Sequence, residues 1–504
     1  MNKTNNIITR FAPSPTGYLH VGNARVALIN YLFAQKNNGK FILRIDDTDK
    51  SRFDSEYLKR IYEDLSWMGL KFDFTFKQTE QTHAYNTYIK KLIDFGKLYP
   101  CYETEEELEL KRKEALQQGK PFIYDRTSLN LNKRDILQFD SEGRKKHYRF
   151  KLDHKTITWQ DMIKGEISFN SENLSDPILV KSDGEVVYIL ASVIDDVRAG
   201  VTHIIRGEDH LTNTAIQIEI FESIAKIHNQ IINEINLLDV SSDNAISSNR
   251  FVDTKYDNEL FTLRYYNQMP KFGHLGLIKA KDGKISKREG GFSVHDLKSD
   301  INPMALKSFL TFMGTSKNII PYTSDEEIIN EFDIESYSKS PTEYSEKELE
   351  LLNRKLMHKL SFEYINTNYP EITENFWEAV KFNINNESEL QTWNKLLFDT
   401  KISQSTDAQQ LLIAKILLDY IENYYGSNEE AVDPSLELNL VVEHLLEHKT
   451  IKEQKTAFTK QQVYQLLRSV LLGGHEGPEL KMILKLLSKD DIVNRIKIFI
   501  YGNQ

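Results

Sequence analysis

From Ile7 to about Phe76 the chain alternates strand and helix patterns, and this alternation constrains the fold more than any other feature. An apolar run over residues 7–12 is followed by apolar residues at helix spacing, namely Ala24, Ala27, Leu28, Tyr31 and Leu32. A second apolar strand, Phe41 to Ile45, precedes a second helix pattern from Tyr57 to Leu65. This order is typical of a parallel sheet covered by helices. We therefore predict an α/β core.

The turn between the first strand and the first helix, residues 13–23, is rich in proline and glycine. The helix N-terminus behind it presents unpaired N–H groups and the positive end of a dipole, which favour phosphate. His20 is placed to bond the same anion, and Gly22 leaves room for a flat ring on the backbone. Taken alone, a histidine after such a turn is more often a helix cap than a ligand.

A second segment, Lys284-Ile285-Ser286-Lys287-Arg288, carries two lysines three residues apart. Asp282-Gly283 before it and Gly290-Gly291 after it indicate a tight loop. Ammonium groups on such a loop can follow the charge that builds up on a leaving pyrophosphate. By itself this pattern is usually a solvated surface. The two segments together, in this order, predict the two halves of one ATP site.

Composition limits the class of protein. The 504 residues are enough for about three domains. The single cysteine, Cys101, excludes an intrachain disulfide and a zinc site built from several cysteines. No apolar stretch is long enough to span a membrane, and residues 1–6 lack the apolar core of a signal peptide, so we expect a cytoplasmic protein.

The net charge of −10 argues at first against a nucleic-acid partner. The segment 144–151 is nevertheless basic with interleaved aromatic residues, which suits a surface that follows a phosphate backbone. Its basic members include Arg144, Lys145, Lys146 and Arg149. A β-strand with a solvated face explains the same pattern equally well.

The middle of the chain has a mixed pattern that indicates an insertion. It predicts helices at Tyr85–Phe95 and Glu105–Gln117 and strands near Tyr148–Leu152 and Thr156–Gln160. The parallel-sheet pattern then resumes with strands expected at Val186–Val193 and Thr202–Arg206. Residues from about Lys226 to Tyr266 lack periodicity and indicate a surface excursion. After about Asn302 long helices dominate, as in Ala408–Tyr424 and Gln461–Leu472.

Polar residues gather where the predicted strands end, which is the edge at which parallel sheets bind ligands. They are Arg10, Ser14, Asp46, Asp47, Asp49, Tyr188, Arg206, Glu208, Asp209 and His210. Two arginines and a carboxylate suit a substrate with two carboxylates and one ammonium group. Structural salt bridges at the strand ends are the competing interpretation.

These residues carry a resemblance to the class I aminoacyl-tRNA synthetases, and within them to bacterial-type glutamyl-tRNA synthetases, over nearly the whole chain. Arg10-Phe11-Ala12-Pro13-Ser14-Pro15-Thr16-Gly17 resembles the family's opening, and His20-Val21-Gly22-Asn23 stands at its "HIGH" signature. The segment from Gly200 to Leu211 and the end of the chain near Gly477-Pro478-Glu479-Leu480 match further family stretches. Lys284 to Arg288 stands for "KMSKS".

The resemblance implies that glutamate and ATP form glutamyl-adenylate and pyrophosphate, and that the glutamyl group then passes to the 3′ end of tRNA-Glu. It implies Arg10 and Tyr188 at the side-chain carboxylate, Arg206 at the α-carboxylate and Asp46 at the ammonium, with Ala12 and Ser14 beside the amino acid. His20, Lys284 and Lys287 would be catalytic. ATP would contact His20, Gly22, Asn23, Asp209, His210, Lys284, Ser286, Lys287 and Arg288, with Mg²⁺ on its phosphates. Arg354 joins the basic segment as a candidate tRNA contact.

The resemblance also implies a division of the chain into a Rossmann-type core with an inserted acceptor-binding domain and a helical anticodon-binding domain. The expected parts are residues 1–78 (first half of the core), 79–185 (insertion), 186–255 (second half of the core), 256–325 (stem-contact region with the "KMSKS" loop) and 326–504 (helical domain). A monomer is expected.

Three departures from the family pattern stand out. Asp46 occupies a position where many members have Glu, Asn23 replaces the last His of "HIGH", and Ile285 and Arg288 differ from "KMSKS". Some members bind zinc in the insertion through several cysteines, whereas here only Cys101 is present, so no structural zinc is expected.

Three alternatives compete with this assignment. A glutaminyl-tRNA synthetase would carry a β-barrel anticodon domain, whereas the C-terminal pattern here is helical. The truncated relative that glutamylates a modified tRNA base lacks an anticodon domain altogether. An inactive tRNA-binding paralogue would be expected to have lost His20, Lys287 or Arg206, and all three are present. Charging of tRNA-Gln in addition to tRNA-Glu stays open.

Overall fold

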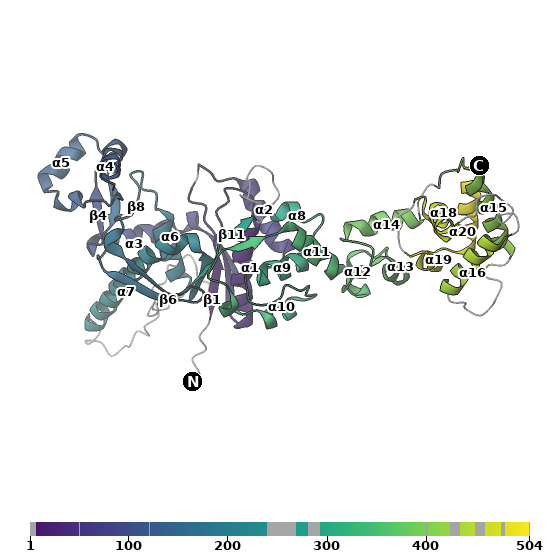
Figure 1. Cartoon of the computed structure of the whole chain (residues 1–504). Coiled ribbons are helices and arrows are strands. Elements are labelled where there is room, and N and C mark those ends of the chain that lie inside the picture. The colour runs from purple at the N-terminus through teal and green to yellow at the C-terminus, as the bar shows by residue number, and fades with distance from the viewer. Residues whose placement is uncertain are drawn as a thin grey trace. The chain divides into compact units, whose positions relative to one another are not determined.

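A computed structural model gives the fold of the chain (Figure 1). It describes residues 7–49, 51–119, 121–238, 269–280, 293–398, 402–423, 434–448, 459–474 and 479–502. The chain divides into two compact units, which we describe separately. The first contains residues 1–297, 307–320 and 324–345, and the second contains residues 298–306, 321–323 and 346–504.

The first unit is built on parallel strands. β1 (Ile8–Phe11), β2 (Lys40–Ile45) and β3 (Phe74–Lys77) pair in that order, and β9 (His203–Gly207) pairs with β10 (Lys271–Leu275). β9 lies beside β1, because Thr202 N donates to Ile8 O at 2.9 Å. β1 and β9 therefore lie at the point where strand order reverses, and their carboxyl ends form the edge at which such sheets bind ligands.

Helices cover this sheet. α1 (Val21–Lys36) follows β1 and α2 (Ser55–Trp67) follows β2, so the predicted strand and helix order of the opening is confirmed. α3 (Thr82–Asp94), α6 (Tyr188–Arg198) and α7 (Leu211–Leu238) contribute to one apolar core with the strands. The α/β fold predicted from the sequence is confirmed.

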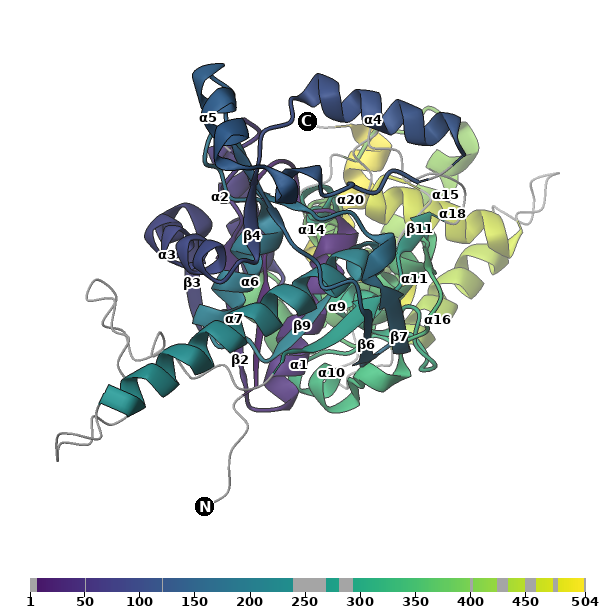
Figure 2. The ribbon, with the colours of Figure 1, turned by 90° about the vertical axis from the view of Figure 1, so that its left-hand side faces the viewer.

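Two sequence-based expectations for this unit were wrong. The run Val186–Val193 is no strand, because α6 begins at Tyr188. Its apolar residues continue through Ile194 and Val197, and a helix can bury such a continuous run on nearly all sides. The irregular stretch expected from Lys226 is helical as far as Leu238, since α7 continues without a break (Figure 2). The rest of that stretch, residues 239–268, lies outside the described residues.

The insertion between β3 and α6 forms an antiparallel sheet of β4 (Leu98–Cys101), β5 (His147–Phe150) and β8 (Ile178–Val180), with α4 (Glu105–Gln117) and α5 (Lys133–Ser141). A separate hairpin of β6 (Thr156–Asp161) and β7 (Gly165–Asn170) reaches the core sheet. There Met162 N donates to Phe272 O of β10 at 2.8 Å. The hairpin is thereby hydrogen-bonded to the core sheet.

The remaining elements of the described chain before residue 346 are short. β11 (Ile278–Ala280) pairs in parallel with β12 (Thr342–Tyr344). α8 (Val294–Leu297), α9 (Pro303–Phe312) and α10 (Asp325–Glu331) complete this region. Arg25 of α1 is buried and donates to the carbonyl of Met313 at 2.8 Å, which fastens α1 to the chain behind α9.

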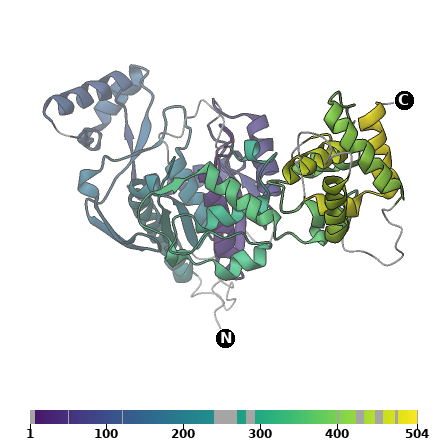
Figure 3. The ribbon, with the colours of Figure 1, turned by 45° about the vertical axis from the view of Figure 1, so that its right-hand side comes forward.

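The described part of the chain from residue 346 onward contains helices and no strand (Figure 3). They are α11 (Glu346–Met357), α12 (Phe362–Asn368), α13 (Glu374–Val380), α14 (Ser388–Phe398), α15 (Ala408–Asn423), α16 (Pro434–Glu447), α18 (Lys460–Leu472), α19 (Leu480–Leu486) and α20 (Lys489–Tyr501). The helical C-terminal region predicted from the sequence is confirmed. Across the described residues, none of the helices has the length and apolar character needed to cross a membrane.

Candidate active site

His20 caps the helix that follows β1. Its Nδ1 accepts hydrogen bonds from Gly22 N at 3.1 Å and Asn23 N at 3.3 Å. Since a neutral imidazole that accepts at Nδ1 carries its proton on Nε2, the distal nitrogen is a donor. The capping alternative considered from the sequence is thus confirmed for Nδ1, and it leaves Nε2 with the chemistry needed to bind phosphate.

Gly22 has a role that the sequence did not reveal. A Cβ at this position would lie 2.9 Å from Cε1 and 3.0 Å from Nδ1 of His20, which is closer than carbon atoms pack. The glycine therefore makes space for the imidazole that caps the helix. Whether it also admits a flat ring remains a prediction.

Gly22→Ala is expected to displace the His20 ring, because the ring is held by its cap hydrogen bonds and cannot yield without breaking them. We expect kcat for ATP-dependent activation to fall at least tenfold, with a small loss of stability from the broken cap, about 1 kcal/mol. Steady-state kinetics and thermal unfolding measure both. An unchanged kcat would show that the position of this ring does not matter.

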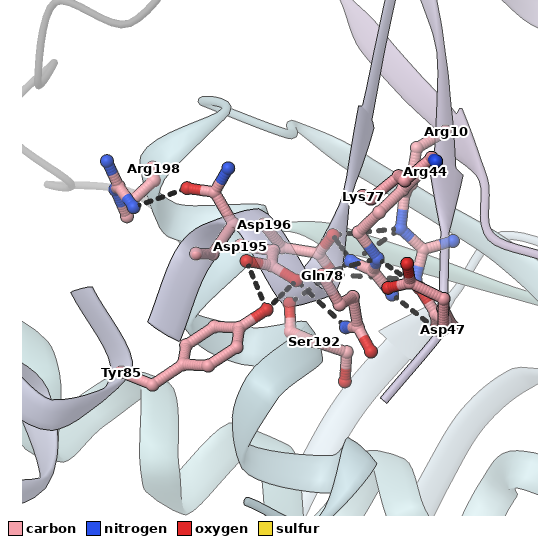
Figure 4. A network of polar contacts seen from close by, with 12 residues as sticks. Arg10, Arg44, Asp47, Lys77, Gln78, Tyr85, Ser192, Asp195, Asp196 and Arg198 are labelled. Carbon is pink, nitrogen blue, oxygen red and sulfur yellow. Dashed lines mark hydrogen bonds and ion pairs between the residues drawn. The ribbon is translucent and has the colours of Figure 1, made fainter. Parts of the chain in front are cut away.

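Two buried arginines and three aspartates form a network at the ends of β1 and β2 (Figure 4). Arg10 Nε lies 3.1 Å from Asp196, and Arg44 Nη1 lies 2.9 Å from the same carboxylate. Arg44 Nε lies 2.7 Å from Asp46 Oδ1 and Nη2 lies 3.2 Å from Oδ2. Burial would lower the pKa of Arg44, but Asp46, Asp196 and Asp195 raise it well above its usual value.

Sequence reasoning missed Arg44 and Asp196, which hold Arg10 and Asp46 in place. Arg44 sits inside the apolar run of β2, where its signal was hidden. Asp195 accepts from Tyr85 Oη at 2.9 Å and Gln78 Nε2 at 2.9 Å. Burial raises its pKa to about 7. The structural salt-bridge interpretation is therefore correct for part of the set.

Arg206 differs from Arg10 and Arg44. It is 8% exposed at the end of β9, and its Nη2 donates to two neutral groups, Thr214 Oγ1 and Gln217 Oε1, both at 2.6 Å. Its Nε has no hydrogen-bond partner, and no carboxylate of the described residues pairs with it. Burial and the nearby Arg10 lower its pKa to about 9. A buried cation in these surroundings is suited to an anion from outside the chain.

Tyr188 lies next to Arg206 at the start of α6, about one-third exposed. Its hydroxyl accepts from Asn213 Nδ2, and its ring meets that of His210 edge-on, with centroids 6.2 Å apart. Burial and the charge of Arg206 lower the pKa of His210 to about 4, so its ring is neutral at pH 7. Tyr188, His210 and Arg206 thus form a second group of neighbouring site residues, in addition to the network of Arg10, Arg44 and the aspartates.

The other predicted site residues differ in exposure and in their partners. Ser14 and Asp209 are exposed, Ala12 is half-buried, and Asp47 is buried and accepts from Thr79 N at 2.9 Å and Thr79 Oγ1 at 2.8 Å. Asp49 binds Ser51 and Arg52 at the surface, and Glu208 accepts from Leu277 N at 2.9 Å. Lys284, Ser286, Lys287 and Arg288 lie outside the described residues.

One of the basic residues predicted to contact tRNA is not at the surface. Arg149 is 5% exposed, lies 4.1 Å above the Tyr124 ring and donates to Asp176 O at 2.7 Å. On this strand His147, Arg149 and Phe150 are buried and Tyr148 is half-buried, so the basic pattern of the segment does not mark an exposed face. Lys145 and Lys146 are exposed, and Arg144 pairs with Glu107 at 2.9 Å. In the C-terminal unit, Arg354 is exposed.

Cys101, Glu103 and His147 have ligand atoms within 4.8 Å of one another in the insertion. Glu103 accepts from Tyr124 Oη and Ser128 Oγ, and burial raises the pKa of the Cys101 thiol to about 11. Within the described part of the chain, Glu103 Oε2 and His147 Nε2 have no hydrogen-bond partner. These three could hold a metal, but a structural zinc takes four ligands, and the described residues supply one fewer. The absence of structural zinc stays a prediction.

Comparisons with known proteins show the family of the chain. The family "tRNA synthetases class I (E and Q), catalytic domain" matches residues 6–270. Glutamate–tRNA ligase 1 of Rickettsia felis and glutamate–tRNA ligase 2 of Rickettsia canadensis are each 39% identical to the chain, over 97% of it and 99% of their own length. The crystal structure of a glutamate tRNA ligase from Elizabethkingia meningosepticum, with its amino acid, is 24% identical with a TM-score of 0.75, and the match covers 98% of this chain and 99% of that one. This last likeness supports the fold.

Proposed function

Because the chain belongs to the class I tRNA synthetases of the E and Q family, we propose that it is a glutamate–tRNA ligase. It joins glutamate to ATP, forming glutamyl-adenylate and releasing pyrophosphate, and then transfers the glutamyl group to the 3′ end of tRNA. The described site contains no residue that must act as a covalent nucleophile. The reaction then relies on positioning and on electrostatic stabilisation of the transition state.

The observation that carries this proposal is the unpaired charge of Arg206. A buried guanidinium bonded only to neutral acceptors is costly in the free protein, and a substrate carboxylate removes that cost. In our assignment Arg206 binds the α-carboxylate of glutamate. The position of the residue at the end of β9, beside β1, supports this assignment because ligands of such sheets bind there.

The side-chain carboxylate is assigned to Arg10 and Tyr188. Arg10 uses Nε and Nη2 on Asp196, and its Nη1 makes no hydrogen bond to the described residues, so the two N–H groups of Nη1 remain for the substrate. Asp46 is assigned to the ammonium group. Arg44 holds both of its oxygens, which sets the direction of the carboxylate even though the side chain is one methylene shorter than Glu.

ATP is assigned to the N-terminal end of α1. His20 Nε2 would donate to the phosphates, with Gly22, Asn23, Asp209 and His210 nearby and Lys284, Ser286, Lys287 and Arg288 contributed by the second motif. Mg²⁺ would bind together with ATP through the phosphate oxygens, which are its usual ligands in such sites. Among the described residues, the set that could hold an ion lies in the insertion and not at α1.

Accessible basic side chains are assigned to the tRNA. Arg144, Lys145 and Lys146 of the insertion and Arg354 of the C-terminal unit are at least partly accessible, and each could bind phosphate. Arg149 is left out because it is buried. We also propose that the protein is a monomer and acts in the cytoplasm.

Charging of purified tRNA-Glu and tRNA-Gln, measured side by side with labelled glutamate and with labelled glutamine, tests this function. We expect glutamate to be attached to tRNA-Glu at the higher rate and glutamine to neither tRNA. Attachment of glutamine to tRNA-Gln would identify a glutaminyl-tRNA synthetase. Binding of tRNA-Glu without any charging would identify an inactive paralogue.

A further inference from the structure

A chain of buried polar groups runs from the inserted hairpin to Arg206. His274 of β10 is fully buried, and its Nδ1 lies 2.5 Å from Asp161 Oδ2 at the end of β6. On the other side of the ring, His274 Nε2 lies 2.8 Å from Thr214 Oγ1. Thr214 Oγ1 is in turn the acceptor for Arg206 Nη2 at 2.6 Å. Asp161, His274 and Thr214 are at most 2% exposed, so water does not compete for these bonds.

The direction of each hydrogen bond follows from the protonation of the ring. Burial lowers the pKa of His274, and hydrogen bonds to His274 and to backbone N–H groups keep the pKa of Asp161 low despite its burial. A neutral ring facing an ionised carboxylate carries its proton on Nδ1, and Nε2 is then an acceptor. The single proton of Thr214 has two acceptors within reach, His274 Nε2 at 2.8 Å and the carbonyl of His210 at 3.2 Å. Donation to the nearer one, His274, directs an oxygen lone pair at Arg206.

Asp161 is itself firmly placed. Its Oδ1 accepts from the backbone N–H groups of Ile163 at 3.0 Å, Lys164 at 2.9 Å and His274 at 3.1 Å. The hairpin turn is also tied to the core by the bond from Met162 N to Phe272 O. The carboxylate is thus a fixed acceptor and has little freedom to follow the imidazole.

We propose that Asp161 and His274 are positioning residues that hold Arg206 in the orientation needed to receive the substrate carboxylate. They act through Thr214, which presents a neutral acceptor, so Arg206 is oriented while its charge is left for the substrate. The insertion therefore supplies, through its hairpin, a residue that shapes amino-acid binding. This inference rests on the proposed role of Arg206.

The hydrogen bonds from Asp161 through His274 and Thr214 to Arg206 form what we call the relay. A matched pair of substitutions at His274 tests it. His274→Gln places a carbonyl oxygen near the position of Nε2 and can still accept from Thr214. His274→Asn keeps a donor near the position of Nδ1 for Asp161 but loses the acceptor for Thr214. For His274→Asn we expect the KM for glutamate to rise about tenfold, the effect of one lost neutral hydrogen bond, with the KM for ATP unchanged. His274→Gln is expected to restore most of the glutamate KM.

Asp161→Asn tests the relay without changing the His274 side chain. Its amide would donate to Nδ1 and move the ring's proton to Nε2. Thr214 would then turn its own proton to the carbonyl of His210, and Arg206 would share the Thr214 oxygen with a second donor, His274. The same selective rise in the glutamate KM is expected, with kcat changed less. KM does not depend on the fraction of protein that is folded, so partial loss of folding cannot produce this result.

The outcomes separate the inference from the proposed function. If wild-type protein activates glutamate and His274→Asn leaves the glutamate KM within twofold, the relay is wrong and the function stands. Equal rises in the KM for glutamate and ATP, or equal effects of His274→Asn and His274→Gln, would likewise overturn it. If wild-type protein does not activate glutamate, the proposed function itself is wrong.

Discussion

Arg206→Gln is expected to lower kcat/KM for glutamate by roughly a hundredfold or more without making the protein less stable. Truncating one member of a buried charged pair between protein and ligand costs about 2–5 kcal/mol, a factor of roughly thirty to several thousand. The effect on stability has the opposite sign, because Arg206 has no acidic partner among the residues that the structure describes. Its pKa in the folded state, about 9, lies below the usual 12.5, so the charged guanidinium destabilises the fold at neutral pH.

Thermal unfolding without substrate and pyrophosphate exchange with glutamate measure the two effects of Arg206→Gln. The unfolding temperature is expected to be no lower than that of wild type. Arg112→Gln is a suitable control, because Arg112 is exposed, its ion pair is with Glu109 on the same helix, and its other contact is with the Phe122 ring in the insertion. It should change neither quantity. An Arg206→Gln protein that unfolds at a clearly lower temperature, or that keeps its kcat/KM, would show that Arg206 is a structural residue.

His20→Asn is expected to lower kcat by about 10²–10³ while leaving stability nearly unchanged. Asparagine is a good N-cap, and its oxygen can accept from Gly22 N and Asn23 N as His20 Nδ1 does. It lacks the distal donor that we assign to the phosphates. A factor of 10²–10³ is typical for removal of one hydrogen-bond donor that acts in a transition state.

His20→Ala separates the two roles of the ring. It loses the cap as well as the donor, so it should show the same fall in kcat together with a loss of about 1 kcal/mol in the free energy of unfolding. Thermal or denaturant unfolding and single-turnover adenylate formation give both values. If His20→Asn keeps kcat within threefold of wild type, His20 is only a cap.

The sequence was sufficient for the parts of the fold that depend on local pattern. The turn before α1 is dictated by proline and glycine, and β2 and α2 follow from clear periodicity, so these elements and the edge that they share could be predicted. Arg10, Asp46 and Arg206 could be predicted because each lies next to the last residue of a strand. Tyr188 was placed in a strand because an apolar run of that length fits a buried helix equally well.

The partners of these residues could not be predicted, because they come from distant segments. Asp196 is 186 residues from Arg10, and Asp161 is 113 residues from His274. Burial of Arg149 depends on which face of β5 packs against Tyr124, and a strand of alternating basic and aromatic residues does not reveal this. Tertiary contacts decide which charges are already paired and which remain for a ligand.

The most direct test of the account is ATP–pyrophosphate exchange with purified full-length protein, tRNA-Glu, and either glutamate or glutamine. We predict exchange with glutamate only, and loss of that exchange in Arg206→Gln. Exchange supported by glutamine and not by glutamate would contradict the account, as would an Arg206→Gln protein that exchanges at the wild-type rate.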